Sequence, residues 1–278
     1  MNLNMDGIYV ISLKRHTTRR KRVHHLLHNN LKVNYTIIDS IDNKEYDLDT
    51  NILDEGFFDP NGWLTKGVLC CALSHQKAWK QFLDSGKEVA MFLEDDIKYT
   101  KYIHNFDFEQ FRKDLDSIEN WGCCFIGKCV DNIHVEDHIK GDIYYGIPLH
   151  PDQFAAHAYI LNRKSAQWYL DNYQKIKYAV DIRLDFSPFK LLSTSKSIFK
   201  QRWPELTKHH KTIATNPKYN WLEEFLHFTL EDGDIVDPLR NDGIMGDIIN
   251  KDLPIAFTED YTLRFKKYSI KGKTFTFF

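Results

Sequence analysis

Three adjacent carboxylates, Glu94, Asp95 and Asp96, directly follow the apolar residues 89–93. The apolar run is too short to span a membrane and is typical of a strand buried on both faces of a parallel sheet. In open α/β sheets, ligands bind in the crevice beyond the carboxyl ends of the strands. Because adjacent carboxylates repel one another, this position favours a hard divalent cation that is shared with substrate phosphates. A solvated acidic turn is the alternative interpretation.

A basic segment follows the first expected strand, residues 7–13. Most of residues 14–22 are Lys or Arg, and Thr17 or Thr18 can cap a helix with apolar positions at helical spacing: Val23, Leu26, Leu27 and Leu31. Cations in a first helical turn oppose the helix dipole, whereas the free N–H groups there bind phosphate. The pattern therefore indicates a bound anion. A nuclear-localisation or nucleic-acid patch is the alternative, and the nearly neutral chain disfavours it.

The rest of this half of the chain alternates strand and helix patterns. Strands are predicted at residues 33–41, 122–127 and 154–162, and helices at residues 66–85, 106–118 and 163–173. Gly86 stands where a glycine often ends a helix, and residues 128–150 give no clear element. The alternation predicts an α/β fold with a mostly parallel sheet and helices on both faces. His75 would lie on the apolar face of its helix, either as a core residue or as a functional one.

Composition limits the classes of function. The chain has 278 residues and a formal net charge of −2, so no global positive field favours nucleic acid. Without a targeting segment or an apolar stretch of about 20 residues, we expect a cytoplasmic protein with no transmembrane span, with peripheral membrane association left open. The cysteines are odd in number and lack zinc-site spacing, so we expect reduced core residues. They are Cys70, Cys71, Cys123, Cys124 and Cys129.

Five stretches carry a resemblance to one family. They are residues 9–15 with Arg19 and Arg20, Gly67 with residues 71–79, residues 92–96, residues 157–161 with Ala166, and the weaker residues 179–181. In this order they resemble glycosyltransferase family 25, which includes bacterial lipooligosaccharide galactosyltransferases and collagen hydroxylysine galactosyltransferases. The resemblance covers about residues 7–185 and fades beyond them.

The resemblance implies a GT-A-type, Rossmann-like fold. Residues 1–185 would form the nucleotide-sugar and catalytic core, and residues 186–278 an acceptor-side and packing or oligomerisation segment, with a homodimer contact as one option. The implied reaction moves galactose or glucose from UDP-galactose or UDP-glucose to a hydroxyl group of a glycan or protein, such as hydroxylysine. It would use Mn²⁺ (or Mg²⁺) and invert the anomeric carbon.

The resemblance also implies roles for individual residues. Asp96, with Asp95, would contact the metal, and Asp95 or Glu94 would meet the ribose. Ser74 and His75 would brace the carboxylate loop or face the donor. The residues expected to border the nucleotide and its diphosphate are Ser12, Leu13, Arg15, Arg19 and Arg20. A third metal ligand could come from His209, His210 or His227.

An inverting transfer needs a carboxylate that takes the proton of the acceptor hydroxyl. Asp181 is the first candidate for this base and Asp185 the second. Alternatively, Asp181 caps a helix or binds hydroxyl groups of the donor sugar. The acidic stretch at residues 231–234 lacks the spacing of a calcium loop, and we interpret it as a turn.

Two other functions compete with the transferase. One is a degenerate family member that binds a nucleotide sugar or a partner without catalysis. The other is a nucleotide-binding oxidoreductase, which the absence of glycine from residues 13–18 disfavours.

Overall fold

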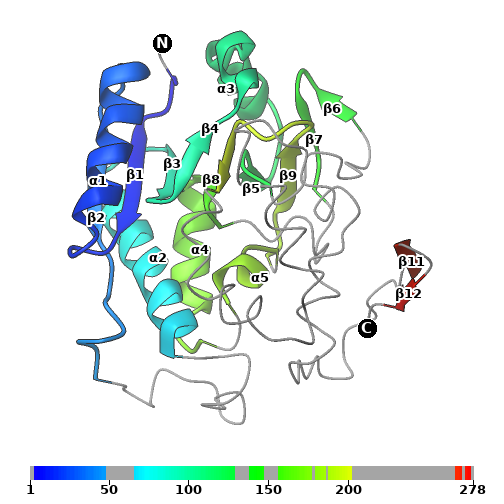
Figure 1. Cartoon of the computed structure of the whole chain (residues 1–278). Coiled ribbons are helices and arrows are strands. Elements are labelled where there is room, and N and C mark those ends of the chain that lie inside the picture. Colours follow the sequence, from blue (N-terminus) through cyan, green and yellow to red (C-terminus); the bar gives the residue numbers. More distant parts are fainter. Residues whose placement is uncertain are drawn as a thin grey trace. The chain divides into compact units, whose positions relative to one another are not determined.

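The computed structural model describes residues 3–47, 66–128, 138–146, 156–176, 179–185, 187–201, 267–270 and 273–276. Up to residue 201 the elements are, in chain order (Figure 1), β1 (Gly7–Ser12), α1 (Thr17–His24), the π-helix η1 (His25–Asn30), β2 (Thr36–Asp39), α2 (Lys66–Asp84), β3 (Val89–Glu94), β4 (Ile97–Tyr99), the 3₁₀-helix η3 (Lys101–Asn105), α3 (Phe108–Asp116), β5 (Trp121–Phe125), β6 (His138–Lys140), β7 (Ile143–Tyr145), β8 (Ala158–Asn162), α4 (Arg163–Asn172), α5 (Val180–Asp185), β9 (Lys190–Thr194) and β10 (Phe199–Gln201).

The main sheet has the strand order β2-β1-β3-β8-β5-β9-β7-β6. β1 runs parallel to β2 and β3, and β5 runs parallel to β9. β8 is antiparallel to both of its neighbours, and β7 is likewise antiparallel to β9 and β6. Within the described residues, six of the eight strands therefore point in one direction. The predicted α/β class with a mostly parallel sheet is confirmed.

Helices cover both faces of this sheet, because successive strand residues point to opposite sides. From β1, Ile8 and Val10 pack in the core on the side of α1, η1 and α3. Tyr9 and Ile11 pack in the core on the side of α2, α4 and α5, which Figure 1 shows grouped together. The sheet is thus buried on both sides, which explains why the strand at residues 89–93 reads as a continuous apolar run.

An aromatic row crosses adjacent strands on the α2 side of the sheet. Tyr9, Phe92, Tyr159 and Phe125 are neighbours in register on β1, β3, β8 and β5. The ring centroid of Phe92 lies 5.6 Å from that of Tyr9 and 5.2 Å from that of Tyr159, and both pairs of rings are stacked. Such pairs each contribute about 0.5–1.5 kcal/mol beyond area burial. Two residues further along β3 on the same side stands Glu94, so this rigid row positions the first carboxylate of the acidic cluster.

The expected strand at residues 33–41 is shorter in the structure. β2 begins at Thr36, because Lys32 adopts a left-handed conformation with φ +58 and Val33 donates its N–H to Leu27 O at 3.0 Å. The first residue of the expected strand, Val33, therefore bonds to the preceding helical turn instead of β1. The stretch expected to be irregular holds β6 and β7, two short, partly exposed strands at one end of the sheet without a clear alternating pattern.

The chain divides into two compact units, Met1–Lys200 and Gln201–Phe278. The first unit extends past residue 185, because β9 pairs with β5 inside the sheet. In the second unit, β11 (Lys267–Ile270) and β12 (Lys273–Thr276) form an antiparallel hairpin. The acceptor-side and oligomerisation roles of residues 186–278 stay predictions.

The sequence also led us to expect reduced cysteines and no transmembrane span. The free thiols include Cys70, Cys71, Cys123 and Cys124, whereas Cys129 lies outside the described residues. Across the described part of the chain, every helix is too short or too polar to cross a membrane.

Candidate active site

A cavity of about 310 Å³ lies at the carboxyl ends of β1 and β3. Because β2, β1 and β3 are adjacent and parallel, their carboxyl ends meet at one edge of the sheet, where open α/β folds bind ligands. Four segments complete the wall: the loop before α1, its first turn, the loop after β2 and the first turns of α2. Most of the predicted donor and metal residues line it: Ser12, Leu13, Arg15, Arg19, Ser74, Glu94, Asp95 and Asp96.

Asp95 and Asp96 are buried residues, at 6% and 7% exposure. Buried charges need partners, and α1 supplies them. Arg19 Nη1 lies 2.8 Å from Asp95 Oδ1 and 3.5 Å from Asp96 Oδ2. Ser12 Oγ donates to Asp95 Oδ2 at 2.7 Å, and His16 Nδ1 lies 3.3 Å from the same oxygen. The basic loop and the acidic cluster, predicted separately, are therefore two sides of one site.

Arg20 binds a carboxylate at the end of β2, and Arg15 binds one in the loop that follows. Arg20 donates from Nη2 to Ser12 O at 2.8 Å and to Asp39 Oδ1 at 2.6 Å, and so ties the ends of β1 and β2 together. Arg15 pairs with Asp42. Hydrogen bonds from Arg20 and Arg15 lower the pKa values of Asp39 and Asp42, respectively. Arg15 borders the cavity, whereas Arg20 is not among the residues that line it, so donor binding by Arg20 stays a prediction.

Ser74 fastens the loop after β2 to α2. Its hydroxyl donates to Cys70 O at 2.6 Å and accepts the N–H of Ile41 at 2.9 Å. One turn later, Lys77 Nζ donates to Asp39 O at 2.7 Å. Ser74 therefore braces the loop after β2. The sequence had led us to expect that it braces the carboxylate loop after β3.

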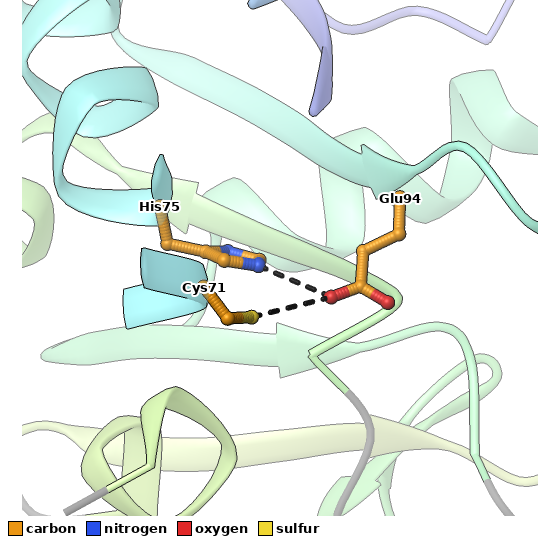
Figure 2. A group of neighbouring side chains, drawn as sticks. All are labelled: Cys71, His75 and Glu94. Atoms are coloured by element: carbon orange, nitrogen blue, oxygen red, sulfur yellow. Dashed lines mark hydrogen bonds and ion pairs between the residues drawn. The ribbon is translucent and has the colours of Figure 1, made fainter. Parts of the chain in front are cut away.

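Figure 2 shows Cys71, His75 and Glu94 pointing toward one another. Cys71 and His75 lie one turn apart on α2, and Glu94 Oε1 lies 3.3 Å from His75 Nε2 and 3.9 Å from Cys71 Sγ. Burial lowers the pKa of His75 to about 4, so its ring is neutral at pH 7. Burial, followed by the charge of Glu94, raises the pKa of the Cys71 thiol well above its ordinary value. His75 therefore braces the carboxylate end of β3, one of its two expected roles.

These three side chains also form a candidate metal site, since their ligand atoms lie within 4.8 Å of one another. Zinc accepts cysteine, histidine and carboxylate ligands in this number. It would require a Cys71 thiolate and a deprotonated His75 Nε2. The contacts of both side chains to Glu94 Oε1 also fit S–H and N–H donors that share one carboxylate oxygen.

Asp181 stands in the first turn of α5 and belongs electrostatically to the same cluster. Burial raises the pKa of Asp181 to about 6, the negative charge of Glu94 adds to this shift, and His75 opposes it. A carboxyl group with this pKa is largely ionised at pH 7 and is a stronger base than an exposed aspartate. Asp185 ends α5, and its side chain lies outside the described residues, as do His209, His210, His227 and residues 231–234.

Sequence reasoning missed three side chains at this edge. His16 lines the cavity and contacts Asp95, and it could have been found within the basic loop. Tyr159 hydrogen-bonds to His75. His157 is 1% exposed, and its backbone O accepts the N–H of Glu94 at 2.9 Å. The last two lie in the family-like stretch 157–161, but that pattern gave no sign of which side of the strand faces α2.

Comparisons with known proteins identify the family of the chain. The family model described as "Glycosyltransferase family 25 (LPS biosynthesis protein)" matches residues 5–184, which is more than half of the chain. Human procollagen galactosyltransferase 2 is 30% identical over 139 residues, 45% of this chain and 21% of that protein. A putative glycosyltransferase of Acanthamoeba polyphaga mimivirus is 31% identical over 172 residues, 59% of this chain and 52% of that protein.

A third relative is the rat "probable inactive glycosyltransferase 25 family member 3", which is 26% identical over 156 residues, 50% of this chain and 25% of that protein. The chain thus matches about a fifth of the length of the procollagen enzyme and about half of the mimivirus protein. The family model extends from just before β1 into α5 and includes the cavity, the acidic end of β3 and Asp181. The chain belongs to glycosyltransferase family 25.

Proposed function

We propose that the chain transfers a hexose, galactose or glucose, from a UDP-sugar to a hydroxyl group of a glycan or protein, with inversion at the anomeric carbon. The observation that carries this proposal is the cavity in which the basic first turn of α1 meets the acidic end of β3. Family membership and the names of the galactosyltransferase relatives give the reaction class.

The nucleotide and its diphosphate would lie on the α1 side of the cavity. Arg15 and Arg19 supply positive charge there, and Arg19 has the planar geometry that suits phosphate oxygens. The first turns of α1 and α2 border the same space, and free N–H groups at helix N-termini favour anions. These groups would also stabilise the negative charge that develops on departing UDP.

Mn²⁺ (or Mg²⁺) would be held by Asp96, with Asp95 beside it. The residues fit a hard divalent cation, since both side chains offer carboxylate oxygens and lie within reach of one cationic group, the guanidinium of Arg19. When bound, such an ion would neutralise diphosphate charge. Asp95 is already held by Ser12 and Arg19, so its part would be smaller than that of Asp96.

Asp181 would act as the base. It would take the proton of the acceptor hydroxyl while the hydroxyl oxygen forms the new bond to the anomeric carbon. The bond from that carbon to the phosphate oxygen breaks, and UDP leaves with its electron pair. The raised pKa of Asp181, about 6, suits a base that works near neutral pH.

The alternative is a family member that binds a nucleotide sugar or a partner without catalysis. The similarity to a probable inactive relative favours this alternative. The presence of both the acidic cluster and Arg19 in one cavity argues against the loss of donor binding.

A screen of UDP-sugars with Mn²⁺, read as UDP release without any acceptor, tests the proposal. We expect release from UDP-galactose or UDP-glucose, and loss of release in Asp96→Asn. Asp171→Asn, an exposed acid on α4, is the matched control. UDP binding without release would favour the binding module, and a protein that neither binds UDP nor releases it would overturn both functions.

A further inference from the structure

Four buried or partly buried side chains form a continuous chain of hydrogen bonds behind the cavity. Trp79 Nε1 lies 2.8 Å from the hydroxyl oxygen of Tyr159, and this oxygen lies 2.8 Å from His75 Nδ1. His75 Nε2 then lies 3.3 Å from Glu94 Oε1. Trp79, Tyr159 and His75 are each 0% exposed, so the two bonds of the Tyr159 hydroxyl are shielded from water.

The chemistry of the groups fixes the direction of every bond. The indole N–H of Trp79 can only donate, so the oxygen of Tyr159 accepts from it. Tyr159 then has its own proton to donate, and burial raises its pKa well above the ordinary value, which keeps this proton in place. His75 Nδ1 is therefore the acceptor. In a neutral imidazole the other nitrogen carries the hydrogen, so Nε2–H donates to the carboxylate of Glu94.

The opposite tautomer of His75 would leave a polar hydrogen unsatisfied. With hydrogen on Nδ1, both Trp79 and His75 would donate to Tyr159, and these two are its hydrogen-bond partners among the described residues. The proton of Tyr159 would then have no acceptor there, which is costly in a buried site. His75 Nε2 would also turn a lone pair toward the negative carboxylate. A metal ion bound to Nε2 would leave the ring hydrogen on Nδ1, so the proton of Tyr159 would again lack an acceptor among the described residues.

The held carboxylate faces the cavity. Glu94 lines the cavity wall, and Cys71, one turn before His75, places its thiol 3.9 Å from the same oxygen, Oε1. Glu94 lies on the α2 side of β3 and acts on the pKa of Asp181. Asp95 instead bonds to β1 and α1. The first and second acids of the cluster thus serve opposite sides of the site.

We infer that Trp79, Tyr159 and His75 are positioning residues that hold the Glu94 side chain as a hydrogen-bond acceptor for hydroxyl groups of the transferred hexose. An ionised carboxylate accepts hydrogen bonds but cannot donate them, so it binds sugar hydroxyls and repels phosphate. This inference rests on the proposed function. It adds a division of the acidic cluster, in which Glu94 serves the hexose and Asp95 and Asp96 serve the diphosphate side.

Two substitutions of His75 separate the two ring nitrogens. In His75→Gln the side-chain amide nitrogen takes the place of Nε2 and can still donate to Glu94. In His75→Asn the amide reaches only the place of Nδ1. We expect His75→Asn and Tyr159→Phe to lower the turnover of UDP-hexose about 10- to 100-fold, His75→Gln to retain it within a few fold, and all three to bind UDP as the unaltered protein does.

Tyr9→Phe is the matched control. Tyr9 is a buried tyrosine of the same aromatic row, and its hydroxyl bonds to Ser85 at 3.1 Å, away from His75. We expect its turnover to be close to that of the unaltered protein. A Tyr159→Phe variant that matches Tyr9→Phe in turnover would overturn the inference, as would a His75→Asn variant as active as His75→Gln.

The tautomer can be measured without any donor. Long-range ¹⁵N–¹H correlation spectra of the full chain at pH 7 should show His75 neutral, with hydrogen on Nε2 and a bare Nδ1. Hydrogen on Nδ1, or a doubly protonated ring, would overturn the inference. If the unaltered protein turns over no UDP-sugar, the proposed function fails, whereas the spectrum still decides whether the hydrogen-bond chain exists.

Discussion

Replacing Asp181 with Asn should stabilise the fold at neutral pH while it abolishes transfer. Burial and the charge of Glu94 raise the pKa of this carboxyl from its ordinary 3.8 to about 6. The folded state therefore holds the proton more tightly than the unfolded state does. The contribution of Asp181 to stability is fully present below about pH 4 and is lost as pH rises through about pH 6. Asparagine is neutral at every pH and avoids this loss.

The size of the effect follows from the shift in pKa. At about 1.4 kcal/mol for each pKa unit, ionised Asp181 costs at most about 3 kcal/mol at pH 8. About half of this cost already applies at pH 5, because an unfolded carboxyl with a pKa near 3.8 is then ionised. Solvent at the partly exposed side chain screens the charge further. The stability advantage of Asp181→Asn should therefore grow by about 1 kcal/mol between pH 5 and pH 8.

Urea unfolding of both proteins at pH 5 and pH 8, at equal ionic strength, measures this change. An amide and a carboxyl group also pack differently, and this contributes equally to the stability difference between the two proteins at both pH values. Comparison of the two pH values therefore removes that contribution. Asp171→Asn, on the surface of α4, controls for the loss of an exposed charge. An advantage that is the same at both pH values, or that shrinks toward pH 8, would refute a raised pKa of Asp181. In the active protein, turnover should rise with pH through an apparent pKa of about 6.

Two further predictions concern the walls of the cavity and the sheet edge. Arg19→Gln removes the cation that lies 2.8 Å from Asp95 and 3.5 Å from Asp96, and we expect the Kd for UDP to rise at least about tenfold, since hydrogen bonds to charged groups contribute about 1.5–3 kcal/mol. Calorimetry that finds an unchanged Kd would exclude Arg19 from donor binding. Gly127→Ala would place a methyl group 2.5 Å from His157 Nε2 and 2.7 Å from Ala158 Cβ, and urea unfolding should show a loss of about 1–3 kcal/mol. Gly86 has φ +72, and a Cβ added there would meet no atom within 4 Å. Gly86→Ala should therefore lower the free energy of unfolding by about 1 kcal/mol through backbone strain alone. A smaller loss in Gly127→Ala than in Gly86→Ala would argue against tight packing of the His157 ring.

Strong local patterns allowed most of the fold to be predicted from the sequence. The run at residues 89–93 forms β3, and the three-and-four spacing after Lys66 forms α2, which ends before the left-handed Gly86 as predicted. The reversed direction of β8 was not predictable, because its apolar pattern does not encode which neighbours it joins. The short strands β4, β6, β7 and β10 were also missed, since three residues carry too little periodicity.

The candidate site was predicted as a set of residue types more accurately than as a geometry. The basic loop and the acidic cluster do lie together, as the meeting of strand ends at one edge requires. The partner of each group was not predictable: Arg20 bonds to Ser12 O and Asp39, whereas Arg19 contacts Asp95. These choices depend on the register of three strands and on the rotation of α1 about its axis. Neither the register nor the rotation can be predicted from the local sequence.

Calorimetry of UDP binding with and without Mn²⁺ most directly tests whether the acidic end of β3 binds a cation together with a nucleotide. We expect UDP to bind with Mn²⁺ present, to bind at least about tenfold more weakly without it, and to lose the same factor in Asp96→Asn. Binding of UDP that depends on Mn²⁺ but is unaffected by Asp96→Asn would place the cation elsewhere, and the absence of any UDP binding would contradict a nucleotide site in this cavity.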